Sequence, residues 1–73
     1  MTEIHRLTGI QVEFLKWVKE DGHILPREFR IFAGAKARVA CTQKGLVVWE
    51  RNRYHLTDEG EVNLSWHQEK GGR

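Results

Sequence analysis

The chain has 73 residues, of which 40% are apolar and 30% are charged, and its formal net charge is +2 at neutral pH. This length leaves room for one small domain, and the share of apolar residues excludes a disordered chain. No apolar run approaches the roughly 20 residues that cross a membrane, and the N-terminus lacks the apolar core of a signal peptide. The single cysteine, Cys41, cannot form an internal disulfide, so we expect a cytoplasmic protein in which Cys41 packs as a small apolar side chain.

The first predicted helix runs from about Gly9 to Asp21. Thr8 and Gln11 have the spacing of a capping box, and Gly22 provides a stop. Its apolar side chains fall within one arc of the helix: Leu7, Ile10, Phe14, Leu15, Trp17 and Val18. We therefore expect this helix to face the core, with Trp17 as a packing residue.

A second, shorter helix is predicted over Arg27–Phe32. Pro26 suits the first position of a helix, and Phe29 and Phe32 are expected to enter the core. A tight turn at Ala33–Gly34 then follows.

The third predicted helix, Ala35–Lys44, has two different faces. Small residues form the expected inner side: Ala33, Ala37, Ala40 and Cys41. Cations, hydrogen-bonding groups and small apolar groups share the outer side with Ala35: Lys36, Arg38, Val39, Thr42 and Gln43. This mixture suits base edges in a DNA major groove, whereas a purely structural surface helix more often carries Glu–Lys pairs.

A β-hairpin is predicted next. Gly45 ends the helix, and the strands Leu46–Trp49 and Tyr54–Leu56 flank a basic turn at Glu50–Arg53. A hairpin with arginines at its tip, placed after a pair of helices, is typical of the wing of a winged helix. Trp49 either covers the sheet or lies exposed beside the wing.

The C-terminal part is predicted to form a short helix from Asp58 to about Trp66, capped by Thr57. Val62 and Trp66 are expected to fold back on the first helix. The domain then comprises residues 1–66, and residues 67–73 form a flexible tail.

The positive charge is concentrated in the middle of the chain. Residues 33–56 carry five basic side chains and one acidic one, a net charge of +4, whereas residues 1–32 sum to zero and residues 57–73 to −2. A localised group of cations is typical of a surface that faces phosphates. The alternative is a solvated surface that is basic by chance.

Two segments, Gly45–Val47 and Tyr54–Gly60, resemble the end of the recognition helix and the wing of winged helix-turn-helix transcription regulators. The likeness is greatest to the DNA-binding core of the MarR (multiple-antibiotic-resistance regulator) group and spans Leu7–Leu64. It implies an α+β fold with a three-helix core, a hairpin wing and a short C-terminal helix. The DNA-binding residues that it implies are Lys36, Arg38, Val39, Thr42, Gln43, Lys44, Arg51, Asn52 and Arg53, with Ala35–Gln43 as the recognition helix.

The chain also departs from that group. It has no sequence for the long flanking helices that build a dimer and a ligand pocket there, so no small-molecule ligand is expected. The wing lacks the acidic residue usually found among its arginines. A homodimer or a protein partner would use exposed residues such as Trp49 and Trp66, or the first helix.

The sequence thus predicts a protein that binds double-stranded DNA as a small transcription regulator or as an architectural accessory factor, nucleoid-associated if it is prokaryotic. The alternative is a phage, viral or adaptor protein-interaction module that binds no DNA and uses an apolar patch of Val47, Trp49 and Trp66. No nucleophile–base pair, phosphate loop or paired-carboxylate motif is present, so we expect no enzyme activity. The four histidines are scattered, and we expect neither a metal nor a cofactor.

Overall fold

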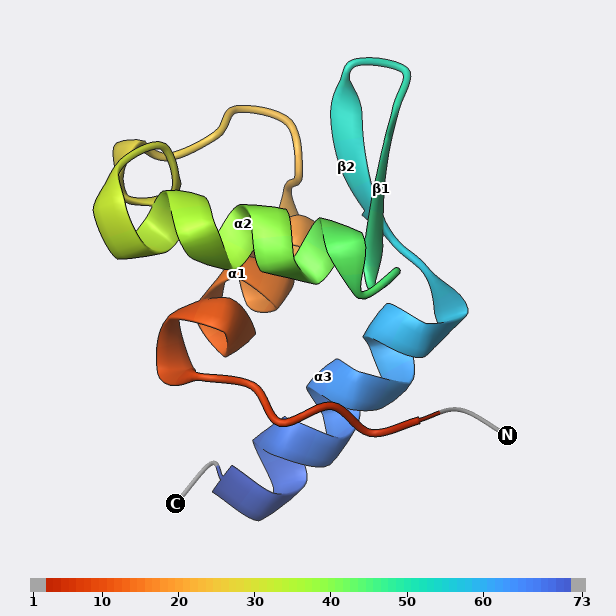
Figure 1. The fold of residues 1–73 in the computed structure, drawn as a ribbon. Coiled ribbons are helices and arrows are strands. Elements are labelled where there is room, and N and C mark those ends of the chain that lie inside the picture. Colours follow the sequence, from red (N-terminus) through yellow and green to blue (C-terminus); the bar gives the residue numbers. More distant parts are fainter. Residues whose placement is uncertain (1–2, 72–73) are drawn as a thin grey trace.

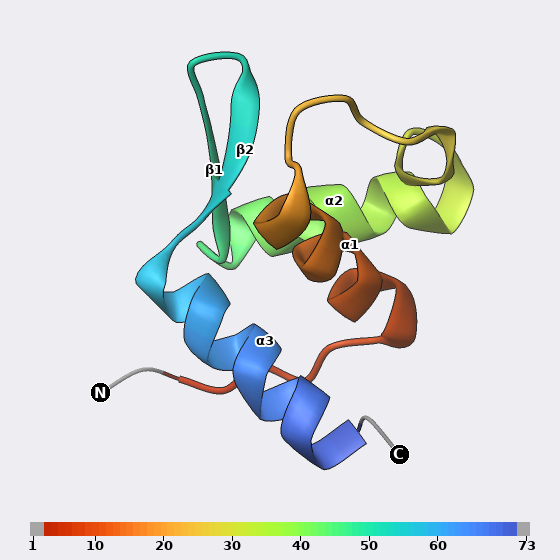
Figure 2. The same cartoon turned by 180° about the vertical axis from the view of Figure 1, so that it is seen from behind.

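Three α-helices and one two-stranded hairpin make up the fold in the computed structural model, which describes residues 3–71 (Figure 1). In chain order the elements are α1 (Gly9–Glu20), the 3₁₀ turn η1 (Arg27–Phe29), α2 (Phe32–Gln43), β1 (Val47–Glu50), β2 (Arg53–Leu56) and α3 (Asp58–Gly71). This α+β arrangement agrees with the coarse prediction. Helices α1 and α2 pack against each other, with α1 in front when the molecule is seen from behind (Figure 2). Within residues 3–71, every helix is too short or too polar to span a membrane.

Helix α1 begins and ends close to the predicted residues. The capping box is formed, because the Gln11 amide donates to Thr8 Oγ1 (3.3 Å) and the Thr8 amide donates to Gln11 Oε1 (3.0 Å). The helix buries Phe14 completely and packs Trp17 against Phe29 and Tyr54, with ring centroids 6.0 and 6.1 Å apart. The prediction of a core-facing α1 with a packed Trp17 is confirmed.

The second helix is shorter than predicted, and the predicted turn at Ala33–Gly34 is wrong. Only η1 forms, and α2 already begins at Phe32. Gly34 is a buried helical residue here, because a Cβ at this position would overlap the carbonyl oxygen of Glu28. The absence of a side chain therefore lets α2 lie directly on η1. In consequence Phe29 is buried as predicted, whereas Phe32 is 84% exposed and lies outside the core.

The hairpin pairs β1 with β2 in antiparallel register, so that Glu50 lies opposite Arg53. Arg51 and Asn52 alone form the turn, and both have a left-handed backbone, with φ of 53° and 63°. Positive φ at both central residues characterises the type I′ turn that suits the twist of a hairpin. The predicted strands are therefore present, and each differs from the prediction by one residue at one or both ends.

Helix α3 is capped by Thr57 as predicted, with the Gly60 amide donating to Thr57 Oγ1 (3.0 Å). It continues to Gly71, five residues beyond the predicted end; residues 72 and 73 of the predicted tail lie outside the described range. The prediction that Val62 and Trp66 pack on α1 is wrong, since they are 43% and 41% exposed.

Asn63 and Leu64 occupy the inner side of α3 instead. The reason is the close approach of Gly60 to Leu46, where a Cβ would overlap the Leu46 carbonyl oxygen. This contact fixes the rotation of α3 about its axis, because the helix can approach Leu46, the residue before β1, so closely only with Gly60 turned inward.

Residues 3–8, here called the N-terminal segment, cross over α3 (Figure 1). The fully buried Asn63 accepts the His5 amide at Oδ1 (2.7 Å) and donates from Nδ2 to the carbonyls of Glu3 (3.0 Å) and Glu59 (2.9 Å). His67 Nε2 donates to the His5 carbonyl (2.8 Å). The first residue of the predicted tail, His67, is thus hydrogen-bonded into the fold.

Candidate nucleic-acid interface

One side of α2 carries a row of exposed side chains, here called the α2 stripe: Phe32, Lys36, Val39 and Gln43. The spacing of four, three and four residues places them on one face of a helix. The opposite side of α2 is buried through Gly34, Ala37 and Cys41. The α2 stripe thus presents one cation, one amide and two apolar groups to solvent.

Four of the predicted residues on α2 are exposed as expected: Lys36, Val39, Thr42 and Gln43. The Thr42 hydroxyl donates to the Arg38 carbonyl (2.9 Å), so its proton is already used within the helix. Phe32 is the residue that the sequence reasoning missed, because it was assigned to the core. A helix that begins at Phe32 would have placed it one turn before Lys36, on the same face.

Arg38 does not lie on the outer face, and that prediction is wrong. Its side chain is half-buried and donates from Nε to the Phe29 carbonyl (3.1 Å) and from one Nη to the Tyr54 hydroxyl (3.4 Å). It thereby ties η1 and β2 to α2. Gly34 lies directly against η1, and this packing brings the Phe29 carbonyl within reach of Arg38, one turn further along α2.

The tip of the hairpin carries Arg51 and Asn52, both exposed, beside the exposed Glu50. Arg53 is exposed as well, but its guanidinium donates to the Asp21 carbonyl. Lys44, at the end of α2, is half-buried.

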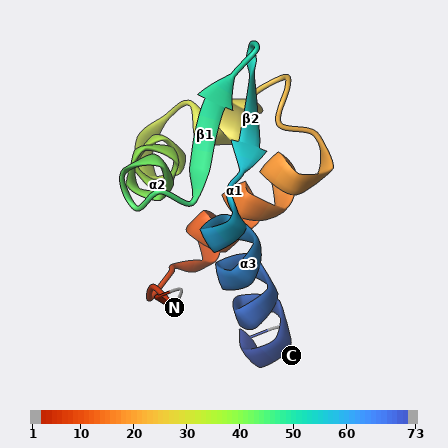
Figure 3. The ribbon, with the colours of Figure 1, turned by 90° about the vertical axis from the view of Figure 1, so that its right-hand side faces the viewer.

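The five basic side chains of residues 33–56 are therefore not all exposed and free to bind a ligand. Two of them, Arg38 and Arg53, make hydrogen bonds within the fold. Lys36 on α2 and Arg51 at the hairpin tip remain exposed, and neither side chain forms a hydrogen bond or an ion pair within residues 3–71. Figure 3 shows these two elements next to each other, with α3 at the opposite end of the molecule.

Trp49, on strand β1, is exposed. Of the two predicted positions, covering the sheet or lying exposed at the wing, the structure therefore has the second. Trp49 is 55% exposed and meets the Tyr54 ring edge-on, with centroids 4.8 Å apart. Val47, which belongs with Trp49 to the predicted apolar patch, is buried. Neighbouring Val48 points to the other face of the strand.

Cys41 is completely buried, as predicted, and its Sγ lies 3.9 Å from the Gln11 carbonyl oxygen. Burial raises the pKa of this thiol from 9.0 to about 11, although the nearby positive charge of Lys44 acts in the opposite direction. Such a thiol is chemically inert near neutral pH. Within the part of the chain that the structure describes, no three His, Cys, Asp or Glu side chains gather as a metal site.

Comparison with known proteins identifies no relative: no protein family, no curated protein and no solved structure matches the chain.

Proposed function

We propose that the protein binds double-stranded DNA in the manner of a winged helix-turn-helix, with α2 as the recognition helix and the hairpin as the wing. The observations that carry this proposal are the exposed α2 stripe and the position of helix α2 beside the hairpin, whose tip is formed by Arg51 and Asn52. In this proposal the helix before the recognition helix is reduced to the single turn η1.

The α2 stripe suits direct reading of bases. Lys36 can donate to the acceptors of guanine, Gln43 can bond adenine through two atoms, and Val39 can touch a thymine methyl group. Helix α2 has 12 residues and is therefore about 18 Å long. The major groove of DNA is wide enough to admit an α-helix. Arg51 would contact a phosphate, which positions the protein without reading sequence.

Affinity is expected to be low for one molecule, because few exposed cations face the DNA. Each phosphate contact lowers the logarithm of the binding constant by about 0.9 per tenfold rise in salt. A monomer held by the Arg51 phosphate contact and a few base contacts is therefore expected to bind measurably only at low ionic strength.

The test is a fluorescence anisotropy titration of a labelled duplex at low salt. The variant Lys36→Ala with Arg51→Ala should bind more weakly, and its salt slope should be smaller by roughly one, because Arg51 is the cation assigned to a phosphate. The matched control is Lys16→Ala with Arg6→Ala, which has the same net charge but changes α1 and the N-terminal segment. Equal affinities of the two variants, or no binding by the unaltered chain, would reject the proposal.

The alternative of a protein-interaction module is less well supported. Its three residues do not form one patch, because Val47 is buried and Trp66 lies on α3, at the other end of the molecule from Trp49. Trp49 alone remains as a contact residue on the hairpin.

A further inference from the structure

Phe32, the first residue of α2, has an unusual environment. Its side chain is 84% exposed, the largest value among the large apolar side chains of residues 3–71. Its backbone has a φ of 51°, in the left-handed region, where a bulky residue is strained. The ring is not among the side chains that form or border the hydrophobic core. The fold therefore imposes backbone strain on a residue whose ring it does not bury.

The strain comes from the short connection before α2. Only Arg30 and Ile31 separate η1 from α2, and Gly34 brings these two elements into direct contact, so the chain turns sharply at Phe32. A glycine would adopt this φ without strain, yet the position holds phenylalanine. Backbone strain of this kind is concentrated at functional sites. The ring is therefore expected to have a use outside the fold.

We propose that Phe32 contacts the methyl group of a thymine in the DNA major groove and gives the protein a preference for thymine at that position. This inference rests on the proposed function. A phenylalanine ring has no hydrogen-bonding group with which to distinguish bases. The C5 methyl of thymine is an apolar group that a base pair presents in the major groove, and phenylalanine is among the side chains that contact it.

The surroundings of Phe32 suit DNA. Phe32 lies one turn before Lys36 and two turns before Val39 on the α2 stripe, so its ring continues the row of side chains proposed to face bases. Arg30, two residues before Phe32, is exposed, and its side chain forms no hydrogen bond or ion pair within residues 3–71. An exposed ring with free cations before and after it in the chain suits a polyanion better than an apolar protein surface.

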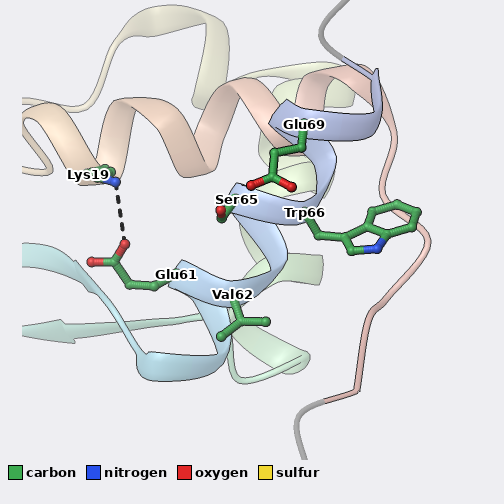
Figure 4. Close-up of a pocket in the computed structure, with 6 residues that line it drawn as sticks. All are labelled: Lys19, Glu61, Val62, Ser65, Trp66 and Glu69. Carbon is green, nitrogen blue, oxygen red and sulfur yellow. Dashed lines mark ion pairs between the residues drawn. The ribbon is translucent and has the colours of Figure 1, made fainter.

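A second exposed aromatic side chain, Trp66 on α3, has a different setting. It borders a pocket that is also lined by Glu61, Glu69 and Lys19, with Lys19 paired to Glu61 at 3.5 Å (Figure 4). Two carboxylates and one ammonium group leave this surface with an excess of negative charge, which repels phosphates. Trp66 is therefore a matched control, because it is an exposed aromatic side chain that the proposal excludes from the DNA contact.

Exchange of thymine for uracil tests the contact, because it removes the methyl group alone and leaves base pairing unchanged. A duplex selected from a random pool by the unaltered chain at low salt provides the site, and each of its thymines is replaced by deoxyuridine in turn. In fluorescence anisotropy titrations, one replacement should weaken binding by the unaltered chain about fourfold, as expected for the burial of one methyl group. Phe32→Ala should bind these two duplexes equally, whereas Trp66→Ala should keep the difference.

The outcomes separate this inference from the proposed function. Duplex binding that tolerates every replacement would overturn the thymine contact and leave the proposed DNA binding intact. Equal discrimination by the unaltered chain and by Phe32→Ala would do the same, and it is the result expected of a ring that contacts a protein or a lipid. A chain that binds no duplex would overturn both proposals.

Thermal denaturation without DNA tests the premise that the ring does not stabilise the fold. Phe32→Gly relieves the strained φ and should leave the thermal midpoint unchanged or raise it. Phe29→Ala removes a buried ring three residues earlier and should lower the midpoint by at least about 10 °C. A lowered midpoint for Phe32→Gly would show that the ring supports the fold, and it would overturn the inference independently of any DNA measurement.

Discussion

Arg38 and Asn63 show how single polar side chains hold segments with little regular structure of their own. Arg38 donates to a carbonyl of η1. Asn63 binds the N-terminal segment through both the oxygen and the nitrogen of its side-chain amide. A buried polar group that loses its partner costs the full free energy of its lost hydration. Each of these side chains therefore contributes chiefly by satisfying backbone groups that would otherwise be unpaired.

Replacing Asn63 by Ala leaves the His5 amide and the Glu3 carbonyl without their partner. We expect the free energy of unfolding to fall by about 1–3 kcal/mol, measured by urea denaturation. The control is Gln68→Ala on the exposed side of α3, which should leave stability nearly unchanged. Equal stability of the two variants would mean that these hydrogen bonds contribute nothing to the fold.

The Cys41 thiol makes the stability of the protein depend on pH in the alkaline range. The folded chain keeps this proton up to about pH 11, whereas the unfolded chain releases it near 9. Stability is therefore fully retained below pH 9 and falls as the pH rises toward 11, by about 2–3 kcal/mol in total.

Urea denaturation across this pH range, compared with Cys41→Ala, isolates the effect, because the other titrating groups are common to both chains. The alanine variant should be less stable at neutral pH but should lose less stability on going alkaline. Parallel curves would contradict a buried, protonated thiol.

At the scale of the elements, amphipathic periodicity and turn chemistry were sufficient for α1 and the hairpin. The capping box, the inward arc of α1 and the presence of a turn within Glu50–Arg53 depend on residues close in sequence, and all three were predicted; the structure narrows the turn to Arg51 and Asn52. The start of α2 and the rotation of α3 were not. Both depend on Gly34 and Gly60, whose contacts with Glu28 and Leu46 come from the packing of separate elements. A sequence pattern treats such glycines only as weak helix formers.

Gly60→Ala separates these two effects. Helix propensity alone would stabilise the variant by up to about 1 kcal/mol. The overlap with the Leu46 carbonyl should outweigh this gain and lower the thermal midpoint instead. Gly9→Ala is the matched control, because open space surrounds that position and the same change should be neutral or stabilising. A raised midpoint for Gly60→Ala would refute the close packing of α3 against Leu46.

At the scale of the whole molecule, the hairpin and helix α3 lie at opposite ends. The exposure of Lys36, Val39 and Gln43 was predictable from helical spacing, since it depends on α2 alone. The hydrogen bonds that Arg38 and Arg53 make within the fold could not be predicted. Their acceptors, the carbonyls of Phe29 and Asp21, belong to the irregular connection between α1 and α2. Charge patterns identify cations, but tertiary contacts decide which of them are free.

The hydrogen bonds from the N-terminal segment to α3 have a consequence for synthesis in the cell. They join residues 58 to 62 positions apart in the sequence, as in His5 to Asn63 and His5 to His67. Synthesis runs from the N-terminal segment toward α3, so this segment must wait until α3 has been made before it can dock. Until then α1 and α2 can already pair, because they are neighbours along the nascent chain. Docking of the N-terminal segment would thus be a late event in folding.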